Sequence, residues 1–342
     1  MPNTVDGLLA TLPEEARRLA RRCPQPEWMS PMLATLTRRR FSSPDWIVER
    51  KLDGERCLAF CDGDAVRLMS RNRRRLDTTY PEIVDVLRTR EHDVVLDGEV
   101  VAFEAGRTSF SRLQRRLGLT VPEAARRSGI AIAFYVFDLL HVDGHDITRL
   151  PVRDRKWLLR RALRFRAPLH FTTHRNTEGE AYFEEACSAG WEGLIAKRAE
   201  SPYAPLRSPN WLKFKCSNRQ ELVIGGFTDP KGTRVGFGAL LIGYYDGGRL
   251  VYAGKVGTGY DVATLREMRT RLDELEQQRS PFADTARVRE HGVHWVKPEM
   301  VAEVAFAEWT NDGMLRHLRF LGLRRDKAPH EVVRERSREV QL

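Results

Sequence analysis

The sequence predicts a two-domain α+β protein, in which antiparallel sheets with flanking helices are followed by a small β-barrel. The chain has 342 residues, more than one domain of ~150 residues, and its 42% hydrophobic content is enough for packed cores. Short runs of aromatic and β-branched residues recur up to about residue 217, and strands with glycine turns and a single helix follow. We therefore expect a helical flank over residues 1–25, a first domain over 26–218 and the barrel over 219–342.

The composition favours a polyanionic partner. Lys and Arg total 57 against 47 Asp and Glu, a formal net charge of +10, which suits nucleic acid. A generally arginine-rich composition is the alternative explanation. No apolar run approaches the ~20 residues of a membrane span, and residues 1–20 lack a signal-peptide core. We therefore expect a cytoplasmic protein without a membrane partner.

The cysteines and histidines show no metal-binding pattern. The five cysteines are scattered and contain no C-x-x-C pair, which argues against a disulfide framework and a structural zinc site. His291 and His294, in H-G-V-H, are expected to be loop residues rather than metal ligands.

The first expected element is an amphipathic helix over Leu12–Arg22, with Pro13 in its first turn. It could pack on the body of the protein or serve as a basic flank. Its apolar positions are Leu8, Leu9, Leu12, Ala16 and Leu19.

A strand is predicted from Trp46, and it delivers Lys51 just before an Asp-Gly turn in K-L-D-G-E-R. Lys51 is either a surface charge at a strand end or a nucleophile held against a sheet. Glu49 and Asp53 share its side of the strand by alternation, and Arg56 adds a permanent positive charge. A lysine amine is nucleophilic only when neutral, so this role requires desolvation or neighbouring cations.

A β-hairpin is predicted next, over Leu58–Phe60 and Ala65–Met69, with a turn at Asp62–Asp64. It ends in S-R-N-R-R-R, residues 70–75. Four arginines there indicate either a solvated loop or a phosphate clamp, and we favour the clamp for Arg71.

Two further strands carry candidate site residues. In Val94–Phe103 the acidic Asp97 and Glu99 point to one side, and such residues need a partner: a structural arginine, a metal ion or ribose hydroxyls. Ala131–Leu140 reads as a strand buried on both faces. Its aromatic residues are core in the ordinary reading, but the face of Phe137 could also stack on a base.

A helix over residues 178–189, stopped by Gly190, precedes W-E-G-L-I-A-K, which carries Glu192 and Lys197. Magnesium uses one or two carboxylates plus substrate phosphate, which two separated glutamates, Glu99 and Glu192, would supply. In the predicted strand Ser208–Lys215, alternation places Trp211, Lys213 and Lys215 on one face. Two lysines on one strand face repel each other, so a bound anion best explains them.

The second half predicts strands at Leu222–Phe227, Ala239–Tyr245 and Leu250–Val256, and a final strand at Met300–Trp309. The helix that begins at Asp261 has one apolar stripe, formed by Leu265, Met268, Leu272 and Leu275. This order fits a Greek-key barrel of the OB type. The charge run at its end, residues 324–327, is either a solvated face or functional.

These motifs resemble, in order, those of the covalent nucleotidyltransferases. K-L-D-G-E-R resembles motif I, L-D-G-E-V motif III, Y-V-F-D-L motif IIIa, E-G-L-I-A-K motif IV, W-L-K-F-K motif V and R-R-D-K motif VI. The S-R-N element and motif VI are similar to those of ATP-dependent DNA ligases. Segments Val251–Tyr260, His294–Pro298 and Ala307–His317 resemble most the ligase domain of bacterial non-homologous end-joining ligases, which we expect to stand alone here.

The resemblance implies an ATP-grasp-like adenylation domain followed by an OB fold. It implies that Lys51 attacks the α-phosphate of ATP, that Lys213 and Lys215 meet that phosphate, and that Asp53 assists the 3′-hydroxyl step. Mg2+ or Mn2+ would bind near Glu99 and Glu192. The nucleotide-binding set would be Glu49, Lys51, Arg56, Arg71, Glu99, Phe137, Glu192, Lys197, Trp211, Lys213, Lys215, Arg324, Asp326 and Lys327.

The implied substrate is nicked double-stranded DNA, including nicks with ribonucleotide 3′ ends, and a Ku-type end-binding protein is a candidate partner. We expect a monomer associated with the nucleoid. An RNA ligase or capping enzyme is the alternative enzyme, against which motif VI argues. A non-catalytic nucleic-acid-binding protein would require a missing charged motif residue, and none is missing.

Overall fold

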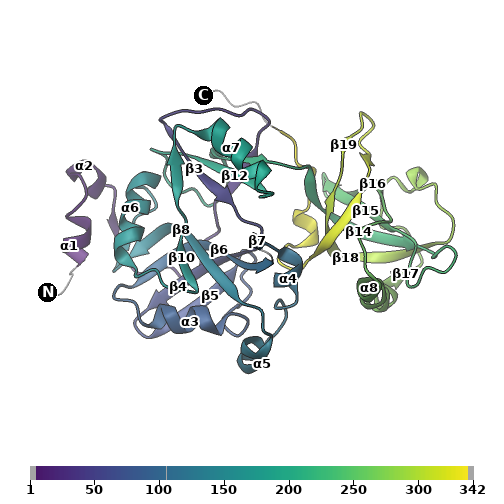
Figure 1. The fold of residues 1–342 in the computed structure, drawn as a ribbon, viewed down its shortest axis with the longest axis horizontal. Helices are drawn as coiled ribbons and strands as arrows, with labels where there is room; N and C mark the ends of the chain where they lie inside the picture. Colours follow the sequence, from purple (N-terminus) through teal and green to yellow (C-terminus); the bar gives the residue numbers. More distant parts are fainter. Residues whose placement is uncertain (1–4, 105, 338–342) are drawn as a thin grey trace. The chain divides into compact units, whose positions relative to one another are not determined.

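The computed structural model describes residues 5–104 and 106–337. Two compact units divide the described residues: those up to Cys216 together with Ser337, and those from Ser217 to Arg336 (Figure 1). Within these described ranges, no helix is long and apolar enough to cross a membrane.

The first unit contains two sheets that are largely antiparallel. The larger sheet has the strand order β1-β9-β8-β6-β4-β5, with β7 paired to β6 and β10 parallel to β8. Its strands are β1 (Arg21–Arg22), β4 (Glu55–Asp62), β5 (Ala65–Ser70), β6 (Val94–Glu104), β7 (Arg107–Thr108), β8 (Ile132–Val142), β9 (His145–Asp146) and β10 (Leu169–Phe171). The predicted hairpin is confirmed as β4–β5, and the strands predicted over Val94–Phe103 and Ala131–Leu140 are confirmed as β6 and β8.

The smaller sheet has the order β11-β3-β12-β13-β2, and only β2 and β13 run parallel. It is built from β2 (Leu33–Leu36), β3 (Trp46–Lys51), β11 (His174–Asn176), β12 (Gly193–Arg198) and β13 (Arg207–Lys215). Figure 1 shows β3 and β12 in one layer and β4, β5, β6 and β8 in another. A cluster of buried side chains from both sheets, including Phe60, Phe137 and Trp211, packs between them.

Helices cover the outer faces. The largest core cluster joins α3, α4 and α6 to the larger sheet, and α7 packs through Tyr182 and Ala186 on the smaller one. The helices of this unit are α1 (Val5–Leu9), α2 (Glu14–Arg17), α3 (Pro81–Arg88), α4 (Phe110–Gln114), α5 (Pro122–Arg127), α6 (Val152–Ala162) and α7 (Gly179–Ser188). Gly190, at φ +71°, follows α7 as predicted.

The predicted N-terminal helix over Leu12–Arg22 is wrong in extent. Two short helices, α1 and α2, replace it, and Arg21 already pairs with Asp146 in a sheet. Leu8, Leu9, Leu12 and Ala16 are buried in the core of the first unit, whereas Leu19 is 40% exposed. The segment therefore packs on the body, because its apolar residues follow the surface of that core rather than a single helical stripe.

The second unit is a six-stranded antiparallel sheet with the order β16-β15-β14-β18-β17, and β21 also pairs with β18. Its elements are β14 (Arg219–Thr228), β15 (Leu240–Asp246), β16 (Arg249–Val256), α8 (Val262–Glu274), β17 (Glu276–Gln277), β18 (Val293–Ala305) and β21 (Arg319–Arg324), with a small hairpin of β19 (Glu308–Trp309) and β20 (Leu315–Arg316). The backbone N–H of Phe320 donates to Thr258 O at 2.9 Å, so the chain after β16 also meets β21.

The predicted α8 is confirmed with its capping residue: Asp261 Oδ1 accepts a hydrogen bond from Thr264 N at 2.7 Å. The final strand begins earlier than predicted, at Val293, so His294 is a strand residue and the loop prediction for it is wrong. Its ring stacks on Phe227 at 4.8 Å and contacts Glu276 and Asp229, long-range partners that the local H-G-V-H pattern does not reveal.

Candidate active site

One face of the smaller sheet collects the three predicted phosphate-contacting lysines and Glu49. Across the central strands, Lys51 lies opposite Gly193 and Gly193 opposite Lys215, while Glu49 lies opposite Ile195 and Ile195 opposite Lys213. Directly paired residues point to the same side of a sheet. The opposite face is apolar, with Val48, Leu194, Ala196, Leu212 and Phe214 in a buried cluster. This burial fixes the register and thereby aims Lys51, Lys213 and Lys215 the same way.

Gly193 allows the strands to approach closely beside Lys51. Its φ is +149°, and a β-carbon there would lie 1.8 Å from Phe214 O. Any side chain would push β12 and β13 apart, so the first residue of β12, directly after Glu192, must be glycine.

Lys51 is held by an acidic partner in this structure. Its Nζ lies 2.5 Å from Glu192 Oε2, with 21% and 6% of the two side chains exposed. Burial lowers the pKa of Lys51, but the carboxylate of Glu192 outweighs it; Lys215 acts downward, Asp53 upward, and the net shift is upward. Lys215 lowers this pKa, which is the effect expected of a neighbouring cation, but the Glu192 carboxylate 2.5 Å from the amine outweighs it.

Glu49 is the centre of a buried charge cluster. Its carboxylate lies 2.5 Å from Lys156 Nζ and 2.7 Å from Lys197 Nζ, and all three side chains are buried. Burial raises the pKa of Glu49, but the two lysines outweigh it and the net shift is downward. Lys156 also donates to Thr172 O at 2.8 Å, so this cluster is anchored to the segment that follows β10.

Two aromatic rings border this cluster. The rings of Phe137 and Trp211 lie 6.1 Å apart edge to face, and Lys197 Nζ lies 4.4 Å and 4.2 Å from their centroids. Trp211 Nε1 is buried and has no hydrogen-bond partner among the described residues. An unpaired buried donor beside two ring faces suits a ligand that supplies an acceptor and a flat π system, as a nucleotide base does.

Arg56 lies at the same junction and is largely committed to another residue. Its guanidinium pairs with both oxygens of Asp97, at 2.5 and 2.6 Å, and donates to Met32 O at 3.1 Å. Burial lowers the pKa of Arg56, but Asp97 outweighs it and the net shift is upward. Tyr203 donates to Asp97 at 2.7 Å. Of the alternatives considered for Asp97, the structure bears out the structural arginine.

Asp138, next to Phe137, is also paired. Arg155 of α6 makes two bonds to its carboxylate, at 2.7 and 2.8 Å, and both side chains are fully buried. Sequence reasoning missed Arg155, Lys156 and Tyr203. For the first two a signal existed: they stand three and four residues after Val152 and three before Leu158 and Leu159, on the buried stripe of α6.

Glu99, Asp53 and Arg71 are half-buried and lie around this junction. Glu99 stands opposite Arg56 in the β4–β6 pair, and Asp53 follows β3 two residues after Lys51. Arg71 is in a tight turn after β5, in which Ser70 Oγ accepts from Asn72 N and Arg74 N at 3.3 and 3.1 Å. Among the described residues no group of three His, Cys, Asp or Glu side chains is arranged to hold a metal. Glu99 and Glu192 thus fit magnesium only as a site completed by phosphate oxygens and water.

The residues of motif VI belong to the second unit. Arg324, at the end of β21, pairs with both oxygens of Asp326 at 2.8 and 2.9 Å and with Glu303 at 3.2 Å. Lys327 lies 3.1 Å from Glu221. The charge run is therefore organised by ion pairs within its own unit.

A disulfide joins Cys187 of α7 to Cys216, directly after Lys215, with a Cα–Cα distance of 5.2 Å. The prediction of no disulfide is wrong. The two cysteines are 29 residues apart, and only the packing of α7 behind β12 and β13 brings them together, so their spacing carried no signal. The backbone N–H of Cys216 also donates to Glu192 O at 3.0 Å, which holds the end of β13 against the residue that pairs with Lys51.

A strand-borne lysine beside a glutamate, two further lysines on the same face and an adjacent aromatic pair define a covalent nucleotidyltransferase site. Comparison with protein families narrows this class. A family described as "ATP dependent DNA ligase domain" matches residues 31–215, and the "ATP dependent DNA ligase C terminal region" matches residues 233–327. The chain therefore belongs to the family of ATP-dependent DNA ligases.

Individual relatives agree with this family assignment. The multifunctional non-homologous end joining protein LigD of Pseudomonas aeruginosa is 37% identical over 335 residues, which cover 96% of this chain and 39% of that protein. The LigD repair protein of Mycobacterium tuberculosis is 39% identical over 315 residues, 90% of this chain and 40% of that protein. The solved structure of mycobacterial DNA ligase D complexed with ATP and MES has a TM-score of 0.64 at 37% identity, and covers 90% of this chain and 98% of that one. The chain thus spans about 40% of the length of these two full-length relatives.

Proposed function

We propose that this chain seals nicks between a 5′-phosphate and a 3′-hydroxyl in duplex DNA through a lysyl-AMP intermediate, with Lys51 as the nucleophile. The observation that carries the proposal is the row Lys51–Gly193–Lys215, with the Glu192 carboxylate 2.5 Å from Lys51 Nζ. Family membership supports the reaction class.

The neutral amine of Lys51 attacks the α-phosphorus of ATP, a P–N bond forms, and the bond to pyrophosphate breaks. The ammonium proton must leave first, and Glu192 is the group in position to hold or release it. Lys213 and Lys215 stabilise negative charge on the α-phosphate. A 5′-phosphate oxygen of the nick then displaces Lys51 from the adenylyl group, and the 3′-hydroxyl, assisted by Asp53, expels AMP.

Base binding is assigned to the junction of the two sheets. We place the purine beside Phe137 and Trp211, where the indole N–H lacks a partner among the described residues, and its edge near Glu49 and Lys197. A divalent metal held by Glu99 and Glu192 would neutralise phosphate charge. Arg56, Arg71, Arg324, Asp326 and Lys327 complete the proposed nucleotide and phosphate contacts.

The biological setting we propose is end joining, because the relatives carry that description. A Ku-type partner and the use of ribonucleotide 3′ ends belong to this proposal, as do action as a monomer and association with the nucleoid. Single-turnover sealing of two nicks that differ only in the 3′-terminal sugar tests the sugar preference. We expect the ribonucleotide nick to be sealed at least as well; a strong preference for the all-DNA nick contradicts this part.

Incubation with α-labelled ATP, and separately with α-labelled GTP, tests the function itself. After denaturing electrophoresis we expect label on the protein from ATP and little from GTP. A protein that is not labelled by ATP in the presence of magnesium or manganese refutes the proposal.

A further inference from the structure

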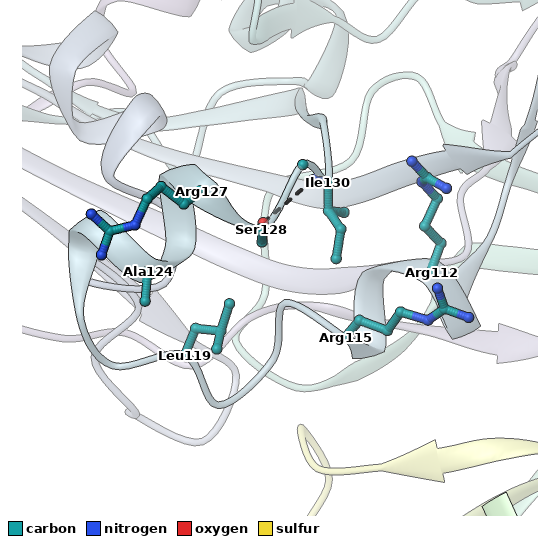
Figure 2. A pocket seen from close by; sticks show the side chains of 8 residues that line it. Arg112, Arg115, Leu119, Ala124, Arg127, Ser128 and Ile130 are labelled. Carbon is teal, nitrogen blue, oxygen red and sulfur yellow. Dashed lines mark hydrogen bonds between the residues drawn. The ribbon is translucent and has the colours of Figure 1, made fainter. Parts of the chain in front are cut away.

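A hollow of about 410 Å³ opens on the surface of the first unit beside α4 and α5, and its lining contains none of the predicted site residues (Figure 2). We call it the arginine hollow. Three arginines line it, Arg112 and Arg115 on one side and Arg127 on the other, around an apolar floor that includes Leu119, Ala124 and Ile130. No acidic side chain lines it.

The guanidinium groups of these three arginines form no ion pair or hydrogen bond with any group in residues 5–104 and 106–337. Arg112 contacts Ser109 only through its backbone, whose N–H donates to Ser109 Oγ at 3.2 Å. Neighbouring arginines behave differently, since Arg126 pairs with Asp85 and Arg116 with Glu82, both at 2.6 Å. Arg112 on α4 and Arg115, which caps the C-terminal end of α4, are three residues apart, and like charges at this helical spacing repel by roughly 0.2–0.5 kcal/mol. Fold stability therefore does not account for the arrangement.

The hollow is preformed by a buried arginine beneath it. Arg116, 1% exposed, donates to Thr79 O at 2.8 Å and to Ile130 O at 3.1 Å. Thr79 Oγ1 in turn donates to Leu119 O at 3.1 Å. Hydrogen bonds thus fix Leu119 and Ile130 of the floor relative to the turn before α3. A ligand would therefore meet a surface that is already ordered.

We propose that the arginine hollow binds the phosphodiester backbone of duplex DNA flanking the nick, an inference that rests on the proposed function. Figure 2 shows Arg127 turned away from Arg112 and Arg115, so the three cannot converge on one small anion. Separated guanidinium groups match successive phosphates of a polyanion, and the apolar floor between them matches the intervening sugar.

The position of the hollow also suits this role. The chain enters α4 from β7, whose Arg107 lies over the segment that carries Glu192: a β-carbon at Gly190 would be 2.9 Å from Arg107 Nη1. Arg107 is exposed, so it presents a further positive charge on the segment that joins β6 to α4. The backbone of one duplex could therefore follow this edge of the first unit and still present its nick to the site.

Binding of a nicked duplex by the full chain, measured by fluorescence anisotropy at several salt concentrations, tests the proposal. The variant carries Arg112→Gln, Arg115→Gln and Arg127→Gln. We expect it to bind at least about tenfold more weakly near 0.1 M salt. Its plot of log binding constant against log salt concentration should be less steep by about two to three, because three phosphate contacts are lost. Self-adenylation from ATP should be unchanged, since no residue of the hollow touches the site.

A matched control variant also loses three positive charges, but from arginines that have acidic partners. Arg126→Gln, Arg164→Gln and Arg175→Gln neutralise exposed arginines that are paired with Asp85, Glu91 and Glu185. The inference is overturned if the hollow variant binds DNA no more weakly than this control, as it would if the hollow served an acidic protein instead. It is also overturned if self-adenylation falls while DNA binding does not, which would indicate a nucleotide site.

The single change Arg127→Gln is less disruptive to folding than the triple change. It should make the plot of log binding constant against log salt concentration less steep by about one. Failure of the hollow and failure of the proposed function are distinguishable. If the unchanged protein is labelled by ATP and seals nicks while both variants bind DNA alike, only the hollow fails. If the unchanged protein neither binds nor seals nicked DNA, both proposals fail.

Discussion

Replacing Arg155 by Met should strongly destabilise the first unit. Arg155 and Asp138 are fully buried, and the change leaves the carboxylate without its cation. It also removes the bonds from Arg155 Nη1 to Leu150 O and Ser201 O, at 2.5 and 3.2 Å. Breaking one side of a buried pair costs about 3–5 kcal/mol. For a unit of this size each kcal/mol lowers the melting temperature by about 2–4 °C, so we expect a decrease of roughly 6–20 °C.

Thermal unfolding followed by circular dichroism, without ATP, measures this effect. Arg160→Met is the matched control, because it makes the same substitution on the exposed side of the same helix. Adding Asp138→Asn to Arg155→Met removes the stranded charge and should recover at least about 1 kcal/mol of the loss. If Arg155→Met melts within about 1 °C of Arg160→Met, the buried pair does not have the energetic role derived from its geometry.

Three other predictions concern the site. The rate of self-adenylation should rise about tenfold per pH unit between pH 7 and 9, because the pKa of Lys51 is raised and only the neutral amine reacts; a flat profile contradicts this. The same raised pKa stabilises the fold fully below the unfolded value of about 10.4 and loses that contribution only above it, so the contribution of Lys51 to the free energy of unfolding should be constant across this pH range. Mass spectrometry after alkylation under denaturing, non-reducing conditions should find three free thiols, Cys23, Cys57 and Cys61, and labelling of five without a reductant excludes the disulfide. Closing this 29-residue separation should stabilise the unit by roughly 3–4 kcal/mol, measurable as a lower melting temperature after reduction. Asp326→Ala should slow adenylation from ATP by more than about tenfold while leaving sealing of pre-adenylated nicks nearly intact, because we propose Asp326 as a contact to ATP; equal loss in both assays contradicts that role.

Local sequence patterns predicted the strands that carry the site, because side chains in each strand alternate between the two faces of the sheet. Alternation in β3 and β13 placed Glu49, Lys51, Lys213 and Lys215 on one face, and the antiparallel register then aligned them. The helix that begins near Asp261 and the αL stop at Gly190 were also predicted, because both depend on residues close in sequence.

Long-range contacts could not be read in the same way. The Lys51–Glu192 pair joins residues 141 positions apart, and the Arg56–Asp97 pair joins residues 41 apart, so neither partner is fixed by spacing. The direction of the Lys51 pKa shift depended on which charge lies nearest, which only the packed sheet decides. The disulfide and the buried Glu49–Lys156 pair were missed for the same reason.

The central claim is that Lys51 is the nucleophile, and Lys51→Ala tests it most directly. With α-labelled ATP the variant should form no acid-labile, base-stable protein–AMP adduct, yet it should still seal a nick that already carries a 5′-adenylate, since that step needs no lysine nucleophile. The second assay shows that the variant is folded and binds DNA. An adduct of wild-type intensity on Lys51→Ala would contradict the account.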